Sequence, residues 1–218
     1  MIISKKIKGI IFDLDGVICH TDKYHYKAWK ELADETGIYF DEEINNRLRG
    51  VSRMESLEII LERAERNYTC EEKFELAERK NERYKILLNE MSPADLSDEV
   101  RDTLNTLRAR GFKLIIGSSS KNAGFILKRI GLGDYFDAIS DGNNITNSKP
   151  HPEVFLLAAE YAGLTPEQCI VVEDAEAGLL AAKAASMIAV AIGWAHGSPN
   201  ADISIDNFGE LLTCQTQP

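Results

Sequence analysis

The sequence predicts a doubly wound α/β core of parallel strands that carries an inserted all-helical cap domain. After residue 92, short β-branched runs alternate with helix-length segments. One strand-like run stands apart at the amino end, and a charged, proline-free stretch separates it from the others. Strands that alternate with helices form βαβ units, and these build a parallel sheet.

The first strand is expected at residues 7–14, a β-branched apolar run that ends in acids and Gly16. Such a run is typical of a strand that is buried on both faces. Between residues 21 and 91 charges are dense and apolar residues recur at helical spacing. Two sets carry this spacing, Leu57, Ile60, Leu61 and Ala64, and more loosely Phe74, Ala77, Tyr84 and Leu88. We expect an insert of about four helices.

The remaining elements follow in alternation. Helices are expected at residues 98–110, 123–130, 153–162 and 175–185, and strands at 112–118, 169–173 and 187–192. Gly111, Gly131 and Gly163 stand where the first three of these helices should end, as C-cap glycines do. The winding is Rossmann-like, with residues 1–18 and 93–218 as the core domain and 19–92 as the cap domain.

Composition narrows the possible partners. The net charge is −10 and the isoelectric point is about 5.0. Proteins that bind nucleic acid or anionic membranes usually carry an excess of lysine and arginine, so neither is an expected partner of this acidic chain. An anion site must therefore be a local basic pocket.

Cysteine usage and hydropathy indicate the compartment. Cys19, Cys70, Cys169 and Cys214 are scattered without metal-ligand spacing, which is typical of free thiols in a reducing cytosol. Asp13 interrupts the amino-terminal apolar run too early for a signal peptide. The longest uncharged apolar run, residues 184–195, is too short to span a bilayer. We expect a cytoplasmic monomer.

Unusual residues follow the predicted strands. Asp13 and Asp15 lie at the end of the first, and two carboxylates at i and i+2 of an extended segment point to the same side. They repel each other unless a cation or a proton lies between them. An isolated pair of this kind also occurs as a helix cap or turn cluster. In parallel sheets, however, ligands bind at the carboxyl ends of strands.

Three more strand or loop ends add to this pair. Ser118, Ser120, Lys121 and Asn122 precede a helix, where hydroxyls, backbone N–H groups and an ammonium form an anion cradle. Lys149 lies in a loop pinned by two prolines, and Glu173 and Asp174 end another strand. Taken singly, these are ordinary caps or surface charges. Together they place hard oxygen ligands for Mg²⁺ beside a phosphate cradle.

These residues resemble the haloacid dehalogenase superfamily of phosphotransferases. Residues 12–16, Ser118, Lys149 and the pair Glu173 and Asp174 match its four motifs in order and spacing. Inside the cap, similarity to the β-phosphoglucomutase family of that superfamily is carried by His25, Trp29, residues 49–53, residues 79–81 and Tyr84. The resemblance covers essentially the whole chain.

The resemblance implies a role for each matching residue. Asp13 would be the nucleophile and Asp15 the general acid/base, with Ser118 and Lys149 stabilising the transferring phosphoryl group. Mg²⁺ would sit on Asp13, Glu173, Asp174 and the backbone carbonyl of Asp15. The implied substrate-binding residues are Thr21, His25, Trp29, Arg49, Gly50, Val51, Arg53, Lys80, Ser120, Lys121 and Asn122.

The implied reaction interconverts β-D-glucose 1-phosphate and D-glucose 6-phosphate. It passes through an aspartyl phosphate and β-glucose 1,6-bisphosphate, which turns over in the site. Such a reaction needs a second grip for the phosphate that is not reacting. Arg53 with Ser120, Lys121 and Asn122 would supply it. A guanidinium suits that task because it can donate two parallel hydrogen bonds to one phosphate group.

The sequence departs from the family pattern at several positions and leaves two other functions open. His20 stands where an aspartate is usual, Arg49 replaces a lysine, Ser119 an alanine and Ala175 a serine. None of these removes a catalytic group, although a histidine near the hinge could alter the pH dependence of closure. A Mg-dependent sugar phosphatase on the same scaffold is the first alternative. A non-catalytic protein that binds a phosphorylated ligand is the second.

Overall fold

The computed structural model describes residues 7–213 and is built around a six-stranded parallel sheet. The strand order is β3-β2-β1-β4-β5-β6. Because β1 lies between β2 and β4, the carboxyl ends of these three strands meet at one edge, where Phe12 is in register with Ile116 and Val172. The strands are β1 (Gly9–Phe12), β2 (Lys113–Gly117), β3 (Ala138–Ser140), β4 (Cys169–Glu173), β5 (Ile188–Ala191) and β6 (Ile203–Ser204).

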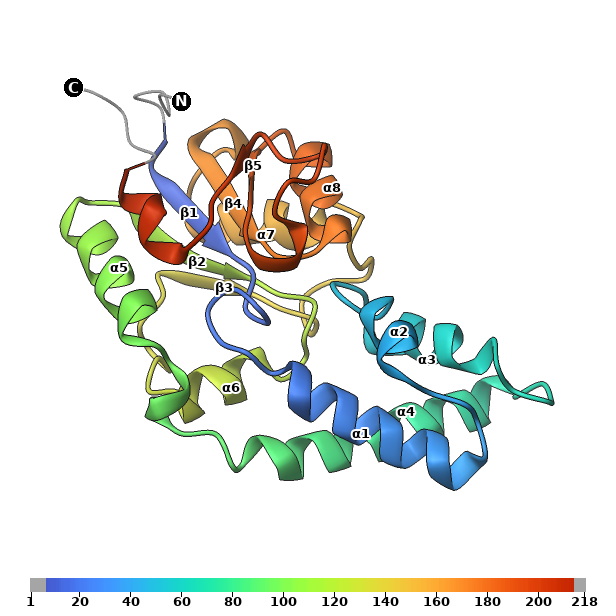
Figure 1. Cartoon of the computed structure of the whole chain (residues 1–218). Helices are drawn as coiled ribbons and strands as arrows, with labels where there is room; N and C mark the ends of the chain where they lie inside the picture. The colour runs from blue at the N-terminus through green and yellow to red at the C-terminus, as the bar shows by residue number, and fades with distance from the viewer. Residues whose placement is uncertain (1–6, 214–218) are drawn as a thin grey trace.

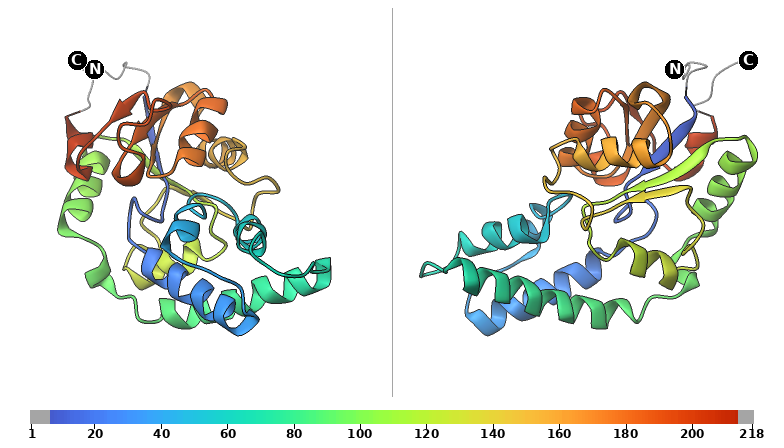
Figure 2. Two further views of the ribbon diagram at one scale, coloured as in Figure 1. Left: turned by 45° about the vertical axis from the view of Figure 1, so that its right-hand side comes forward. Right: turned by 180° about the vertical axis from the view of Figure 1, so that it is seen from behind.

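Helices cover both faces of the sheet (Figures 1 and 2). On one face lie α5 (Asp98–Ala109) and α6 (Ala123–Arg129), and on the other α7 (Glu153–Tyr161) and α8 (Glu176–Ala184). Successive residues of β1 face opposite layers, because side chains alternate along a strand. Ile10 and Phe12 pack with the α5 and α6 side chains, whereas Ile11 packs with those of α7 and α8.

Four helices precede α5 and extend to one side of the sheet (Figure 1). They are α1 (Asp22–Thr36), α2 (Glu42–Asn46), α3 (Arg53–Leu61) and α4 (Cys70–Leu88), and we call residues 22–88 the helical insert. Capping boxes at Ser52 and Thr69 begin α3 and α4. A separate apolar cluster that includes Trp29, Leu57 and Leu76 holds the four helices together.

The structure confirms the doubly wound parallel sheet and the alternation predicted for its core. The predicted elements are present, each end lies within two residues of its predicted position, and two short strands, β3 and β6, were not predicted. The helical insert has its four helices, but Phe74 is 62% exposed instead of packed, and Ala64 lies beyond α3. The division into two domains at residues 18/19 and 92/93 stays a prediction.

The structure also tests two expectations, about the state of the cysteines and about membrane-spanning helices. Cys19, Cys70 and Cys169 are free thiols, while Cys214 and the tail beyond residue 213 lie outside the described residues. None of the helices within residues 7–213 is long and apolar enough to cross a bilayer.

Candidate active site

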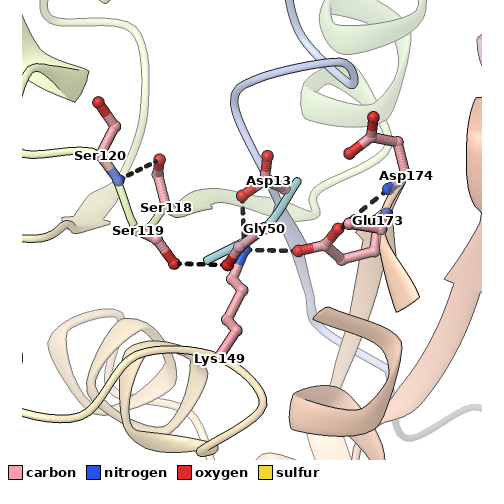
Figure 3. Close-up of polar contacts among 9 residues, drawn as sticks. Asp13, Gly50, Ser118, Ser119, Ser120, Lys149, Glu173 and Asp174 are labelled. Carbon is pink, nitrogen blue, oxygen red and sulfur yellow. Dashed lines mark hydrogen bonds and ion pairs between the residues drawn. The ribbon is translucent and has the colours of Figure 1, made fainter. Parts of the chain in front are cut away.

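The centre of the site is a buried lysine between two carboxylates (Figure 3). Asp13 directly follows β1, Glu173 ends β4, and Lys149 reaches them from the loop before α7. The Lys149 Nζ lies 2.5 Å from Asp13 Oδ1 and 2.5 Å from Glu173 Oε1. Burial alone would lower the pKa of Lys149, but the two carboxylates outweigh it and raise that pKa above its ordinary value. The lysine is therefore a fixed positive charge beside Asp13.

Three acidic side chains form a cluster that could hold a metal ion. One carboxylate oxygen each from Asp13, Glu173 and Asp174 lies within 4.8 Å of the others, and all three residues are buried. Burial raises the pKa of Glu173, and Lys149 offsets part of this effect while the charge of Asp13 adds to it. Burial also raises the pKa of Asp174, and repulsion from Glu173 and then Asp13 raises it further. Buried carboxylates with unfavourable mutual repulsion are a donor set that fits a hard divalent cation such as Mg²⁺.

Two glycines make room for these acids. A Cβ atom on Gly16, whose φ is +90°, would come within 2.1 Å of Asp174 Oδ2. A Cβ on Gly178 in α8 would lie 1.9 Å from Glu173 Oε1. The Glu173 carboxylate is also fixed by the backbone N–H groups of Asp174 and Ala175, at 3.0 and 3.1 Å. The acids are thus oriented by their surroundings before any ligand binds.

Asp15 lies at the turn that leads from β1 toward the helical insert. Its Oδ1 accepts a hydrogen bond from the hydroxyl of Thr21, the residue before α1. Desolvation, followed by the charge of Asp13, raises the pKa of Asp15 to about 7, while the Thr21 bond works in the opposite direction. A carboxyl group with this pKa can both donate and accept a proton near neutral pH, which suits a general acid/base.

The chain after β2 forms an ordered polar turn. Ser118 Oγ accepts from the Ser120 N–H at 3.1 Å, and Ser120 Oγ accepts from the Asn122 N–H at 3.2 Å. Two bonds tie this turn to the helical insert: Ser119 Oγ donates to the Gly50 carbonyl at 3.3 Å, and Asn122 Nδ2 donates to Asn81 Oδ1 at 3.0 Å. The insert is therefore docked over the sheet edge in this structure.

A cavity of about 380 Å³ lies between the helical insert and the sheet edge. Most of the residues predicted for the site line it: Asp13, Asp15, His25, Trp29, Arg49, Gly50, Val51, Arg53, Lys80, Ser118, Ser120, Lys121, Asn122 and Asp174. Thr21, Lys149 and Glu173 are fully buried and do not line the cavity. Each is hydrogen-bonded to an acid that does: Thr21 to Asp15, Lys149 to Asp13 and Glu173 to Asp174. The structure thus brings the predicted residues together around one cavity.

A buried polar pair forms the wall contributed by the helical insert. Lys80 of α4 lies 2.9 Å from His25 Nδ1 of α1, and the ammonium also stands over the rings of Trp29 and Tyr84, at 4.7 and 4.5 Å. Burial and the neighbouring cation lower the pKa of both His25 and Lys80, with Lys80 acting on His25 and Arg53 acting on Lys80. A neutral His25 can accept a hydrogen bond from Lys80 at Nδ1, so the two side chains hold each other in place.

Arg53 reaches the cavity with a partner that was not predicted. Its guanidinium donates to Glu78 of α4, and both residues line the cavity. Glu78 and Asn81 were not among the predicted site residues. Asn81 belongs to the cap segment that carries the family resemblance, but it was not assigned a role in the site. Nothing in the sequence indicates Glu78, because its pairing with Arg53 depends on how α3 packs against α4.

Comparisons with known proteins agree with this geometry. The family of haloacid dehalogenase-like hydrolases matches residues 7–186. The β-phosphoglucomutase of Bacillus subtilis is 42% identical over 207 residues, covering 94% of this chain and 92% of the relative. The fructose-1-phosphate phosphatase of Escherichia coli is 35% identical over 187 residues, covering 85% and 96%. The crystal structure of a β-phosphoglucomutase from Clostridium difficile superposes with a TM-score of 0.89 at 40% identity, covering 94% of this chain and 93% of the other.

Proposed function

We propose that this chain, which belongs to the haloacid dehalogenase-like hydrolase family, is a β-phosphoglucomutase. It interconverts β-D-glucose 1-phosphate and D-glucose 6-phosphate through an aspartyl phosphate and β-glucose 1,6-bisphosphate, which also serves as activator. The observation that carries this proposal is the composition of the cavity wall. The cavity that contains Asp13 and Asp15 is also lined by a second set of groups whose chemistry suits phosphate binding, on Arg53, Ser120, Lys121 and Asn122.

In this proposal Asp13 attacks the phosphorus atom of a bound sugar phosphate. Its carboxylate needs no deprotonation at neutral pH, and the acyl phosphate that results can pass its phosphoryl group on. Asp15 gives a proton to the departing sugar oxygen and, in the reverse direction, takes one from the attacking sugar hydroxyl. The pKa of about 7 keeps both protonation states of Asp15 accessible.

The transferring phosphoryl group carries negative charge that must be neutralised. Lys149 is fixed beside Asp13, and Ser118 is buried at the end of β2. Asp13, Glu173, Asp174 and the backbone carbonyl of Asp15 would hold Mg²⁺. A bound Mg²⁺ supplies charge neutralisation for the phosphoryl oxygens. These groups are oriented in advance, which is where most of the stabilisation of such a transition state arises.

The helical insert would bind the sugar and the phosphate that is not reacting. Trp29, His25 and Lys80 form one wall, and Gly50 and Val51 lie on the loop that contacts the core. Thr21 links the entry to the insert with the acid/base through its bond to Asp15. Closing this insert over the sugar would exclude water, which otherwise competes with the sugar hydroxyl for the aspartyl phosphate.

A sugar phosphatase is the second candidate, and one specific observation favours it. Arg53, which the mutase needs for the distal phosphate, is held by Glu78. A phosphatase has little use for that grip, because water accepts the phosphoryl group. One relative, the Escherichia coli enzyme, is a fructose-1-phosphate phosphatase at 35% identity.

An assay that follows two products at once separates these candidates. The protein is given β-D-glucose 1-phosphate, Mg²⁺ and a trace of bisphosphate, and glucose 6-phosphate and free phosphate are measured together. The mutase forms glucose 6-phosphate, and the α-anomer of glucose 1-phosphate serves as the control that should not react. Free phosphate as the main product would support the phosphatase. If neither product forms, the result would support a protein that only binds a phosphorylated ligand.

A cytoplasmic, monomeric state is proposed on composition alone.

A further inference from the structure

Arg49 connects the helical insert to the acidic cluster of the core. It lies between α2 and α3, and its guanidinium pairs with Asp22 Oδ1 at 2.9 Å and with Asp174 Oδ2 at 3.6 Å. Its Cζ also stands 4.8 Å from the ring centroid of Trp194. The Arg49 side chain is only 17% exposed, and that of Asp174 only 6%. An ordinary surface arginine has neither this burial nor three such partners.

The backbone beside Arg49 is packed on the core and fixes the position of the side chain. The Gly50 carbonyl accepts from Ser119 Oγ, and a Cβ on Gly50 would lie 3.0 Å from the Cβ of Ala175. Gly50 has a φ of +75°, a conformation that favours glycine. Arg49 is thus held beside Asp174 by the way the loop docks.

A second cleft lies on the outer side of Arg49. Its volume is about 690 Å³, and Arg49, Val51 and Asp174 line both this cleft and the active-site cavity. Trp194, in the 3₁₀ turn Gly193–Ala195 after β5, lines the outer cleft and is 70% exposed. The guanidinium therefore borders a second cleft and already lies beside an aromatic ring that lines it.

The charges of the cluster explain why a cation belongs at this position. Asp13, Glu173 and Asp174 contribute three carboxylates, and Lys149 is the cation that bonds two of them. Lys149 bonds Asp13 and Glu173, whereas the cation that forms an ion pair with Asp174 is Arg49. Two cations at one carboxylate repel each other, so a metal ion on Asp174 would compete with the Arg49 guanidinium for that carboxylate.

We propose that Arg49 is the counter-ion of Asp174 in the metal-free protein, that Mg²⁺ displaces it, and that Asp22 and the Trp194 ring retain the displaced guanidinium. The proposal rests on the metal centre of the proposed function. Since Arg49 belongs to the insert and Asp174 to the core, the exchange changes one contact between the two parts whenever the metal binds. Arg49 is thereby a positioning residue that links occupancy of the metal site to docking of the insert.

The test is the affinity of the sugar-free protein for Mg²⁺, measured by calorimetry. Arg49→Met removes the charge but keeps an unbranched side chain, so Mg²⁺ no longer competes with a guanidinium and should bind about threefold to tenfold more tightly. Arg47→Met is the matched control, because Arg47 lies on the same loop and lines the outer cleft but pairs with the exposed Glu62. It should leave the affinity unchanged.

Tryptophan fluorescence gives an independent readout that does not depend on turnover. Mg²⁺ should change the emission of the wild-type protein, because the guanidinium moves relative to the Trp194 ring. The change should be absent in Trp194→Phe and in Arg49→Met, although both still bind the metal. Circular dichroism checks that each variant is folded.

Two results would overturn the proposal, and they differ in what else they remove. If Mg²⁺ binds the wild type and Arg49→Met equally well, or binds the variant more weakly, Arg49 is not a competing counter-ion and the proposed mutase is unaffected. If the wild type does not bind Mg²⁺ at all, the metal centre of the proposed function fails together with this inference.

Discussion

The hydroxyl of Thr21 donates a hydrogen bond to the carboxylate of Asp15, across the turn that joins β1 to the helical insert. This bond stabilises the charged form of Asp15 against desolvation and the nearby Asp13, which together raise the Asp15 pKa to about 7. Thr21, the residue directly before the insert, therefore lowers the pKa of the proposed acid/base.

The first prediction concerns pH. Transfer from β-glucose 1,6-bisphosphate to Asp13 needs the protonated form of Asp15, so its rate should be high below about pH 7 and fall above it. Thr21→Val removes a bond that lowers the Asp15 pKa. The pKa should rise, and the alkaline fall in rate should move to higher pH. Rapid-quench measurement of phosphoenzyme formation between pH 5.5 and 9 follows the shift.

Thr21→Ser is the matched control, because it keeps the hydroxyl and should keep the wild-type profile. The ionisation of the substrate phosphate is common to all three proteins and cancels in the comparison. Identical profiles for the wild type and Thr21→Val would mean that Asp15 is not the group that titrates.

The second prediction concerns the nucleophile. Asp13→Asn keeps the shape of the side chain but removes the attacking oxyanion, so turnover should fall at least about a thousandfold. The variant should remain folded, because the change also relieves repulsion within the acidic cluster. Steady-state rates and a thermal melt together provide the check. A variant that retains a tenth of the wild-type rate would exclude the covalent mechanism.

The third prediction concerns the metal. Exhaustive treatment with EDTA should abolish turnover, and Mg²⁺ should restore it, because the cluster of Asp13, Glu173 and Asp174 offers only hard oxygen ligands. The measurement is activity before chelation, after it, and after metal is added back. Full activity in the chelated protein would remove the proposed role of the cluster.

The fourth prediction concerns the distal phosphate. Arg53→Ala removes a charge-assisted contact of roughly 2–4 kcal/mol, so isomerisation should fall by roughly thirtyfold or more. Phosphorylation of Asp13 by acetyl phosphate should change much less, because that donor has no second phosphate. Arg63→Ala, at an exposed position of the same insert, is the control. Equal isomerisation by all three proteins would place Arg53 outside the substrate site.

A change at Glu78, the partner of Arg53, also tests whether Arg53 binds the distal phosphate. Its carboxylate holds Arg53 through an ion pair that a phosphate would have to replace. Glu78→Gln keeps the shape but removes the competing charge, so glucose 6-phosphate should bind more tightly to the variant than to the wild type. Calorimetric titration with glucose 6-phosphate gives the two affinities. Weaker binding to the variant would mean that Glu78 orients Arg53 for the phosphate instead of competing with it.

The core of the fold and its acidic cluster could be predicted because their signals are local. Glu173 and Asp174 follow a buried apolar run directly, and the carboxyl ends of parallel strands necessarily meet. The strand β6 has only two residues and is defined by its pairing with β5, so no periodicity could indicate it. The exposure of Phe74 was also unpredictable, because a loose helical spacing does not say where an apolar face ends.

Contacts between the helical insert and the core could not be predicted from the sequence. The pairs Arg49–Asp174 and Asn81–Asn122 join residues that are far apart in the chain, and they depend on how the insert docks. The resemblance to a known family indicated Arg49 as a site residue but gave no partner for it. Trp194 carried no signal at all, since a single exposed aromatic residue after a strand is unremarkable in a sequence.

The most direct test of the central claim is how the aspartyl phosphate of the wild-type protein divides between sugar and water. The protein is primed with β-glucose 1,6-bisphosphate and given β-D-glucose 1-phosphate and Mg²⁺, and the ratio of glucose 6-phosphate formed to free phosphate released is measured. If the cavity holds a phosphate at each end of the sugar, glucose 6-phosphate should exceed free phosphate by a wide margin. Release of free phosphate with no glucose 6-phosphate would contradict the mutase and leave a phosphatase built on the same site.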